Sequence, residues 1–104
     1  MTLLTQYIAL HNQGVESGDF APMLSLFDEA AEMHFERVPY GPLIGRAAIA
    51  DGFRNTPPDD ALILLDAHVD GATTVARYSW ERHPTEGILV IEAVNDQIIK
   101  LTVR

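Results

Sequence analysis

Mostly apolar residues recur at the spacing of one helical face near the start of the chain. The members of this stripe are Leu4, Tyr7, Ile8, His11 and Val15. Their spacing of three and four residues predicts a helix over 2–15, with Thr2 as its N-cap and a stop at Gly18. A second, shorter helix is predicted from an N-cap at Asp19 through Phe27, since Asp suits the N-cap position and a proline is tolerated in the first turn.

The pattern then changes to alternation, which is typical of a strand. Over residues 31–37, Met33 and Phe35 share one face, and the polar face carries Glu32, His34 and Glu36. We interpret His34 and Glu36 as an exposed pair and not as a metal site, because metal sites usually need at least three protein ligands. A loop rich in proline and glycine follows at 38–45, and residues 46–55 are predicted as a third helix.

Four further strands are predicted after residue 61. Strands at 62–69 and 73–82 flank Asp70-Gly71, and strands at 87–94 and 98–103 flank a turn at Asn95-Asp96. Because helices come first and strands later, the order favours an α+β fold over a parallel α/β sheet. We therefore predict one α+β domain over residues 1–104, with the helices covering one face of a mostly antiparallel sheet.

Composition excludes several classes of function. The formal net charge is −8, from fifteen acidic residues against seven Lys and Arg, so we expect no nucleic-acid or anionic-membrane partner. Acids such as Asp59 and Asp60 are scattered, as expected for a solvated surface. The chain has no cysteine, which excludes thiolate chemistry and Cys-based metal sites. Without a signal-peptide pattern, a membrane-spanning run or a phosphate-binding motif, we expect a cytoplasmic protein that uses no cofactor.

Four segments are similar to those of one superfamily. They are Gly18-Asp19-Phe20, Leu26-Phe27-Asp28-Glu29-Ala30, Gly45-Arg46-Ala47-Ala48-Ile49, and the turn Asn95-Asp96 with the following Ile98-Ile99-Lys100-Leu101. Together with the order of elements, they resemble the nuclear transport factor 2-like (NTF2-like) superfamily, specifically its SnoaL-like and ketosteroid-isomerase-like branch. The resemblance covers nearly the whole chain.

The resemblance implies a cone-shaped half-barrel in which three helices precede most of a curved sheet, with an apolar pocket inside the cone. It also implies homodimers formed through the outer face of the sheet. Members of this branch isomerise, dehydrate, cyclise or hydrolyse small hydrophobic molecules, and others bind ligands or proteins without catalysis. Scaffold motifs of this kind indicate the fold more strongly than the activity.

The catalytic residues of the ketosteroid isomerases do not carry over. In a register without gaps, the position of their oxyanion tyrosine holds His11, with Tyr7 one turn earlier. The position of their general-base aspartate holds Phe35, and that of the second acid holds Val90, with Glu92 one alternation further. A dienolate mechanism requires a base. We therefore expect that the chain is not a ketosteroid isomerase.

Three residues are candidates for acid–base chemistry. His11, with Tyr7 four residues before it on the same stripe, is either an imidazole that acts on a ligand or a buried structural histidine. Glu92 is the third candidate, but its strand is apolar on both faces, so alternation does not decide whether it meets the pocket or solvent.

The candidate ligand-binding residues are Phe35, Arg37, Tyr78, Trp80 and Val90. Tyr78 and Trp80 share one strand face and are predicted to form an aromatic wall, with plain core packing as the alternative. Arg37 shares the presumed inner face with Phe35, where it would meet an anionic ligand at the mouth of the cone.

Two hypotheses from different classes follow. In the first, the domain binds a small hydrophobic molecule and is an isomerase-, hydrolase- or dehydratase-type acid–base enzyme. In the second, it is a non-catalytic binding or dimerisation module whose pocket is mostly packed shut. In both we expect a homodimer, because strands such as Leu89-Val90-Ile91 are apolar on both sides and large exposed apolar patches mark interfaces.

Overall fold

The computed structural model describes residues 2–104. Within them the chain forms three helices, α1 (Leu3–Ser17), α2 (Ala21–Leu24) and α3 (Arg46–Asn55). The hydroxyl of Thr2 accepts a hydrogen bond from the Thr5 N–H and so caps α1, which ends at Gly18. Gly18 has a φ of 82°, a left-handed conformation that glycine adopts without strain. None of these helices is both long enough and apolar enough to cross a membrane.

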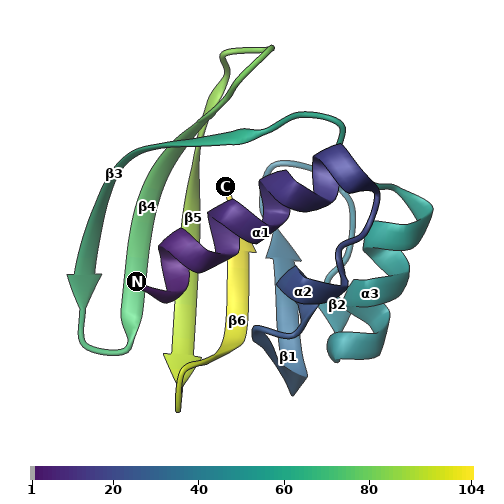
Figure 1. The fold of residues 1–104 in the computed structure, drawn as a ribbon. Helices are drawn as coiled ribbons and strands as arrows, with labels where there is room; N and C mark the ends of the chain where they lie inside the picture. Colours follow the sequence, from purple (N-terminus) through teal and green to yellow (C-terminus); the bar gives the residue numbers. More distant parts are fainter. Residues whose placement is uncertain (1) are drawn as a thin grey trace.

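Six strands form one curved sheet within residues 2–104 (Figure 1). They are β1 (Phe27–Phe35), β2 (Leu43–Ile44), β3 (Leu62–Asp70), β4 (Thr73–Trp80), β5 (Glu86–Val94) and β6 (Gln97–Val103). Their order is β2-β1-β6-β5-β4-β3. The β1–β6 pair is parallel, and the other four neighbouring pairs are antiparallel. All three helices lie on one side of this sheet.

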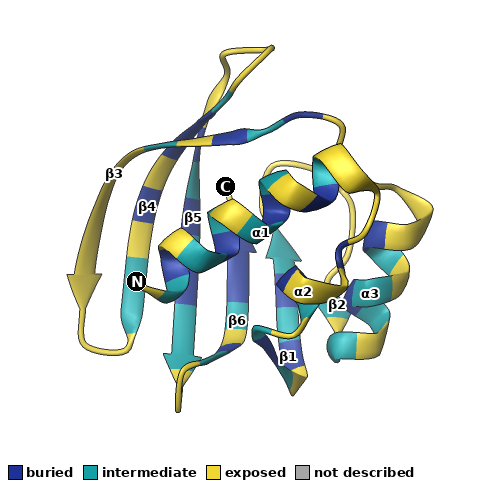
Figure 2. Ribbon diagram, in the orientation of Figure 1, coloured by how far each residue is buried: buried dark blue, intermediate teal, exposed yellow. Residues whose placement is uncertain are grey.

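The core lies between the concave face of the sheet and the helices. Its largest fully buried side chains are Phe27, Met23, Ile49, Ile98 and Leu101. Each contributes about 1.5–3 kcal/mol by leaving water. Figure 2 shows buried positions on the helix sides that face the sheet and along β1, β4, β5 and β6, whereas most of β3 is exposed. The side of the cone near β1 is therefore the better packed one.

The predicted fold class is confirmed: helices and a curved, unclosed, mixed sheet form an α+β cone. The four-strand meander is antiparallel, and α3 spans the predicted residues 46–55. The loop predicted at 38–45 contains the short strand β2, whose Leu43 and Ile44 pair with Met33 and Glu32.

The largest differences from the predicted element boundaries lie at the start of β1 and the end of α2. β1 begins at Phe27 and not at residue 31, because Phe27 pairs with Ile98 before a bulge brings Glu32 opposite Lys100. The second helix is correspondingly short, since the chain is already part of the sheet where the helix was expected to end. Asp19 does not occupy the N-cap, but its carboxylate accepts a hydrogen bond from the Ala21 N–H at 3.0 Å.

Candidate functional site

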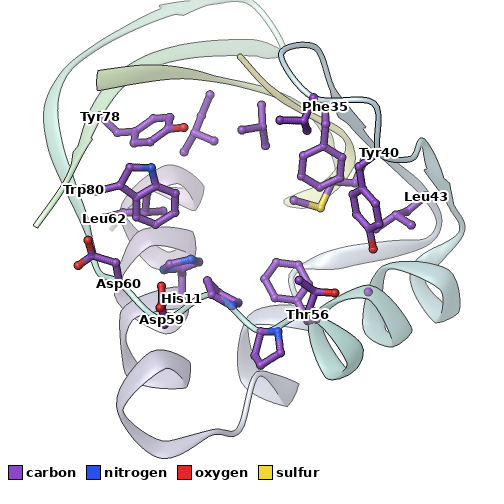
Figure 3. Close-up of a pocket in the computed structure, with 18 of the residues that line it drawn as sticks. His11, Phe35, Tyr40, Leu43, Thr56, Asp59, Asp60, Leu62, Tyr78 and Trp80 are labelled. Carbon is purple, nitrogen blue, oxygen red and sulfur yellow. The ribbon is translucent and has the colours of Figure 1, made fainter. Parts of the chain in front are cut away.

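A cavity of about 530 Å³ lies between α1, α3 and the concave face of the sheet (Figure 3). Its apolar walls come from β1, the following loop, α3, β5 and β6, through Met33, Phe35, Leu43, Phe53, Leu89 and Val103. The segment 56–60, which joins α3 to β3, borders the cavity together with His83 from the β4–β5 loop. Volumes of this size are typical of sites for small organic molecules.

Helix α1 directs Tyr7 and His11 into this cavity. The two residues are one helical turn apart, their ring centroids are 6.1 Å apart, and both are buried. The Nδ1 atom of His11 lies 3.0 Å from Oδ1 of Asn12. Burial lowers the pKa of His11, with the Asn12 hydrogen bond acting in the opposite direction. The imidazole is therefore neutral near pH 7.

Strand β4 supplies the aromatic wall. Tyr78 and Trp80 alternate onto the concave face and meet edge to face, with ring centroids 5.6 Å apart. Trp80 also lies 6.1 Å from the ring of His11. The Tyr78 hydroxyl lies over Gly87 of β5, where a Cβ atom would overlap it, so the absence of a side chain at Gly87 makes room for the tyrosine.

Among the polar atoms of the residues that line the cavity, three on Tyr7, Tyr78 and His11 have no hydrogen-bond partner within residues 2–104. The hydroxyls of Tyr7 and Tyr78 and Nε2 of His11 take part in none of the hydrogen bonds that side chains form within residues 2–104. In that part of the chain, every side-chain nitrogen or oxygen of a buried or half-buried residue either has a hydrogen-bond partner or keeps accessible surface. These three atoms therefore keep accessible surface, and the cavity is the surface that their residues line.

Both tyrosines remain protonated. Burial raises the pKa of Tyr7, and the nearby Tyr78 hydroxyl adds to the effect. Burial also raises the pKa of Tyr78, although the positive charge of Arg37 acts in the opposite direction. Each hydroxyl is thus available as a hydrogen-bond donor at neutral pH.

Of the other predicted site residues, Phe35 lines the cavity and Arg37 does not. Phe35 lines the cavity beside Tyr40, with ring centroids 5.2 Å apart. Arg37 follows β1, is exposed and is absent from the cavity walls, although its charge acts on Tyr78. It therefore influences the cavity from outside.

Glu92 and Val90 point away from the cavity. On β5 the buried positions are Leu89 and Ile91, each 2 % exposed, and Leu89 lines the cavity. Alternation therefore turns Val90 and Glu92 to the outer face, where Glu92 lies opposite Lys100. The interpretations of Glu92 as an acid–base residue and of Val90 as a pocket residue do not fit this placement.

Asp60 is buried, contrary to the expectation of a solvated surface acid. Its side chain is only 6 % exposed, and its carboxylate accepts backbone N–H bonds from Ala61, Arg82 and His83. Burial opposes its ionisation, but these bonds, together with one to the His83 ring, lower the pKa of Asp60. Asp60 thereby fastens the segment before β3 to the β4–β5 loop beside the cavity.

No metal centre forms within residues 2–104, where no three His, Asp or Glu side chains gather closely enough to hold an ion. The predicted pair of His34 and Glu36 is not a contact. His34 Nε2 instead lies 2.8 Å from Oε1 of Glu32, and Glu36 lies 2.8 Å from Nε of Arg104.

A curved, unclosed sheet, with helices over its concave face and an aromatic-lined cavity between them, is characteristic of the NTF2-like class of proteins. The family model described as the SnoaL-like domain matches residues 6–98. The chain therefore belongs to the SnoaL-like family of the NTF2-like superfamily. No curated protein matches the sequence.

Solved structures share the fold at low sequence identity. A putative polyketide cyclase from Sinorhizobium meliloti has a TM-score of 0.71 at 14% identity, with all of both chains covered. An NTF2-like protein of unknown function from Burkholderia xenovorans has a TM-score of 0.74 at 15% identity, covering 98% of this chain and 81% of the other. A protein from Sphaerobacter thermophilus has a TM-score of 0.77 at 20% identity, covering 98% and 91%. Likeness at this level of identity establishes the fold alone.

Proposed function

We propose that this domain binds a small, flat, mostly apolar molecule bearing a carbonyl or hydroxyl group, and that His11 acts on it as an acid–base residue. The observation that carries the proposal is the set of unpartnered polar atoms, from Tyr7, Tyr78 and His11, in a cavity whose other walls are mostly aromatic and aliphatic. Sites for small molecules combine apolar walls with a few convergent polar groups in this way. A cavity of about 530 Å³ is not expected of a module packed shut.

The chemistry is a proton transfer next to a carbonyl group. The neutral His11 ring takes a proton from the carbon beside the carbonyl, and the electrons of the broken C–H bond form an enolate. The hydroxyls of Tyr7 and Tyr78 donate hydrogen bonds to the developing oxyanion. Return of the proton from His11 to another carbon of a conjugated enolate gives an isomer. Attack of the enolate carbon on a second carbonyl gives a ring, and the alkoxide formed from that carbonyl then takes the proton from His11.

The name of one structural relative agrees with this chemistry. The protein from Sinorhizobium meliloti is described as a putative polyketide cyclase, and ring closure through an enolate is one outcome of the same proton transfer. The proposal does not extend to ketosteroid isomerisation, because Phe35 stands in the cavity where the resemblance places the general-base aspartate.

The experiment measures proton exchange in a model ketone. 2-Tetralone carries acidic hydrogens between its carbonyl and its aromatic ring, and their replacement by deuterium in D2O is followed by NMR. We compare the wild type with His11→Leu, and His68→Leu is the matched control because His68 is an exposed residue of β3 outside the cavity.

We expect the wild type and His68→Leu to accelerate the exchange, and His11→Leu to lose about 10²-fold or more of that acceleration. The stability of His11→Leu should be nearly unchanged, because Oδ1 of Asn12 keeps its hydrogen bond from the Leu62 N–H. If all three proteins exchange 2-tetralone at the uncatalysed rate, or all three at the same accelerated rate, the role of His11 is refuted.

The proposal extends to assembly and location. The outer face of the sheet carries Val75, 37 % exposed, opposite Val90, and the three helices of residues 2–104 all lie on the other face. An apolar centre surrounded by charged groups is typical of a two-fold interface. We therefore propose that a second copy of this chain packs against this face. We also propose a cytoplasmic location, because a cysteine-free chain needs no oxidising compartment.

A further inference from the structure

The side chain of Asn12 connects α1 to the first residue of β3. Its Nδ2 donates to the Leu62 carbonyl at 2.9 Å, and its Oδ1 accepts from the Leu62 N–H at 2.8 Å. The amide thus pairs with the Leu62 backbone through two bonds, as a neighbouring strand would. This pairing fixes the orientation of the amide, because the reversed orientation would set NH2 against N–H and oxygen against oxygen.

The fixed amide determines which nitrogen of His11 carries the proton. Nδ1 of His11 lies 3.0 Å from Oδ1 of Asn12, and that oxygen is an acceptor only. Nδ1 must therefore be the donor. In the neutral ring the second nitrogen, Nε2, is then unprotonated and offers a lone pair. Nε2 is also the ring nitrogen without a partner among the hydrogen bonds of residues 2–104.

We propose that Asn12 is a positioning residue that holds His11 in the Nδ1–H form, so that Nε2 faces the cavity as an acceptor alongside two hydroxyls able to donate, those of Tyr7 and Tyr78. This arrangement selects a ligand that combines a carbonyl oxygen for the tyrosines with an O–H or acidic C–H group for Nε2. The ligand class rests on the proposed function, whereas the protonated nitrogen of His11 does not.

The opposite form of the ring would reverse the selection. With the proton on Nε2, His11 would be a donor beside the two tyrosine hydroxyls, and its ring could not take a proton from the ligand. Burial lowers the pKa of His11, which keeps the lone pair free at neutral pH. The side-chain amide of Asn12 thus decides whether Nε2 of His11 is able to accept a proton from a ligand.

The first measurement is a long-range 15N–1H NMR correlation spectrum of the imidazole rings, which distinguishes protonated from unprotonated nitrogens without any ligand. At pH 8 we expect Nδ1 of His11 to be protonated in the wild type. Asn12→Asp keeps an acceptor oxygen for Nδ1–H and should retain this form. Asn12→Leu removes the acceptor and should shift His11 toward the Nε2–H form. Circular dichroism reports whether each variant is folded.

The second measurement compares 2-naphthol with 2-methoxynaphthalene by calorimetry. In 2-methoxynaphthalene a methyl group replaces the hydroxyl hydrogen of 2-naphthol, so only 2-naphthol donates a hydrogen bond, and a free Nε2 acceptor should favour 2-naphthol by about tenfold in the wild type and in Asn12→Asp. Asn12→Leu should bind both probes about equally. Equal affinities in the wild type would overturn the inferred selection of donors.

The outcomes separate the two proposals. Protonation of Nε2 in the wild type would overturn the assignment directly, and an unchanged Nδ1–H form in Asn12→Leu would overturn the positioning role of Asn12. If the wild type shows the Nδ1–H form and prefers 2-naphthol but does not exchange 2-tetralone, the proposed catalysis fails and this inference stands.

Discussion

Replacing Gly14 with alanine tests the packing of α1 against the ring of Phe20, the residue just before α2. Gly14 is a buried residue of α1. A Cβ atom at this position would overlap Cδ1 of Phe20 and lie 2.6 Å from Cε1 and 2.9 Å from Cγ. The Phe20 ring has little room to move, because it is buried and packs against Phe53 at 5.3 Å and His11 at 6.3 Å between ring centroids.

Two effects of opposite sign decide the result. Alanine is favoured over glycine in a helix interior by about 1 kcal/mol. Forcing a methyl group into a packed core costs about 1–3 kcal/mol, and three ring atoms of Phe20 lie closer to the new methyl than real Cβ contacts allow. The difference between the two effects is about 0–2 kcal/mol, so we expect Gly14→Ala to lower the free energy of unfolding by up to about 2 kcal/mol, and Tm by about 4–8 °C per kcal/mol.

Urea denaturation followed by circular dichroism measures this difference. Ala9→Gly, at an exposed position of α1, measures the intrinsic preference in the same helix and should cost about 1 kcal/mol. In a Phe20→Leu background, which removes most of the ring, Gly14→Ala should instead be neutral or stabilising. A stabilising effect of Gly14→Ala with Phe20 present would refute the reasoning.

Three further predictions address the cavity and the assembly. Because burial lowers the pKa of His11 below its ordinary value of 6.5, the unfolded state binds more protons below that pH. The wild type should lose up to about 1.4 kcal/mol of stability per pH unit as pH falls through this window, and His11→Leu should lack this component, so parallel urea profiles would contradict it. Gly87→Ala should push Tyr78 toward the cavity, shifting the emission of Trp80, the single tryptophan, and weakening 2-naphthol binding; unchanged emission and affinity would argue against the contact. Light scattering should give twice the mass of one chain, and a single negative charge in Val75→Asp should reduce it to one chain; a wild-type monomer at micromolar concentration would exclude the dimer.

Local pattern predicted much of the fold because most elements are determined by neighbours in sequence. The stripe containing Tyr7 and His11 has helical spacing, and the turns Asp70-Gly71 and Asn95-Asp96 are short-range signals. The start of β1 was missed because it depends on Ile98, far along the chain. Pairing across such a distance leaves no periodicity to detect.

The site was only partly predictable, for physical reasons. Helical spacing indicated that Tyr7 and His11 share a face, but β5 is apolar on both sides, so alternation alone did not assign Glu92 to the outer face. Asp60 looks like any acid in a polar turn, and its partners Arg82 and His83 belong to a distant loop. Asn12 was overlooked for the same reason, since its partner Leu62 is 50 residues away.

The central place of β6 has a consequence for how the chain reaches its folded state. β6 follows every other element in sequence, yet it lies between β1 and β5 in the sheet. The first contact of β1 with it, Phe27 with Ile98, closes a long loop, and such high contact order slows folding. Until β6 docks, β1 and β5 each present an open edge that is able to pair with another chain. Self-association thus competes with folding at the stage when the cavity does not yet exist.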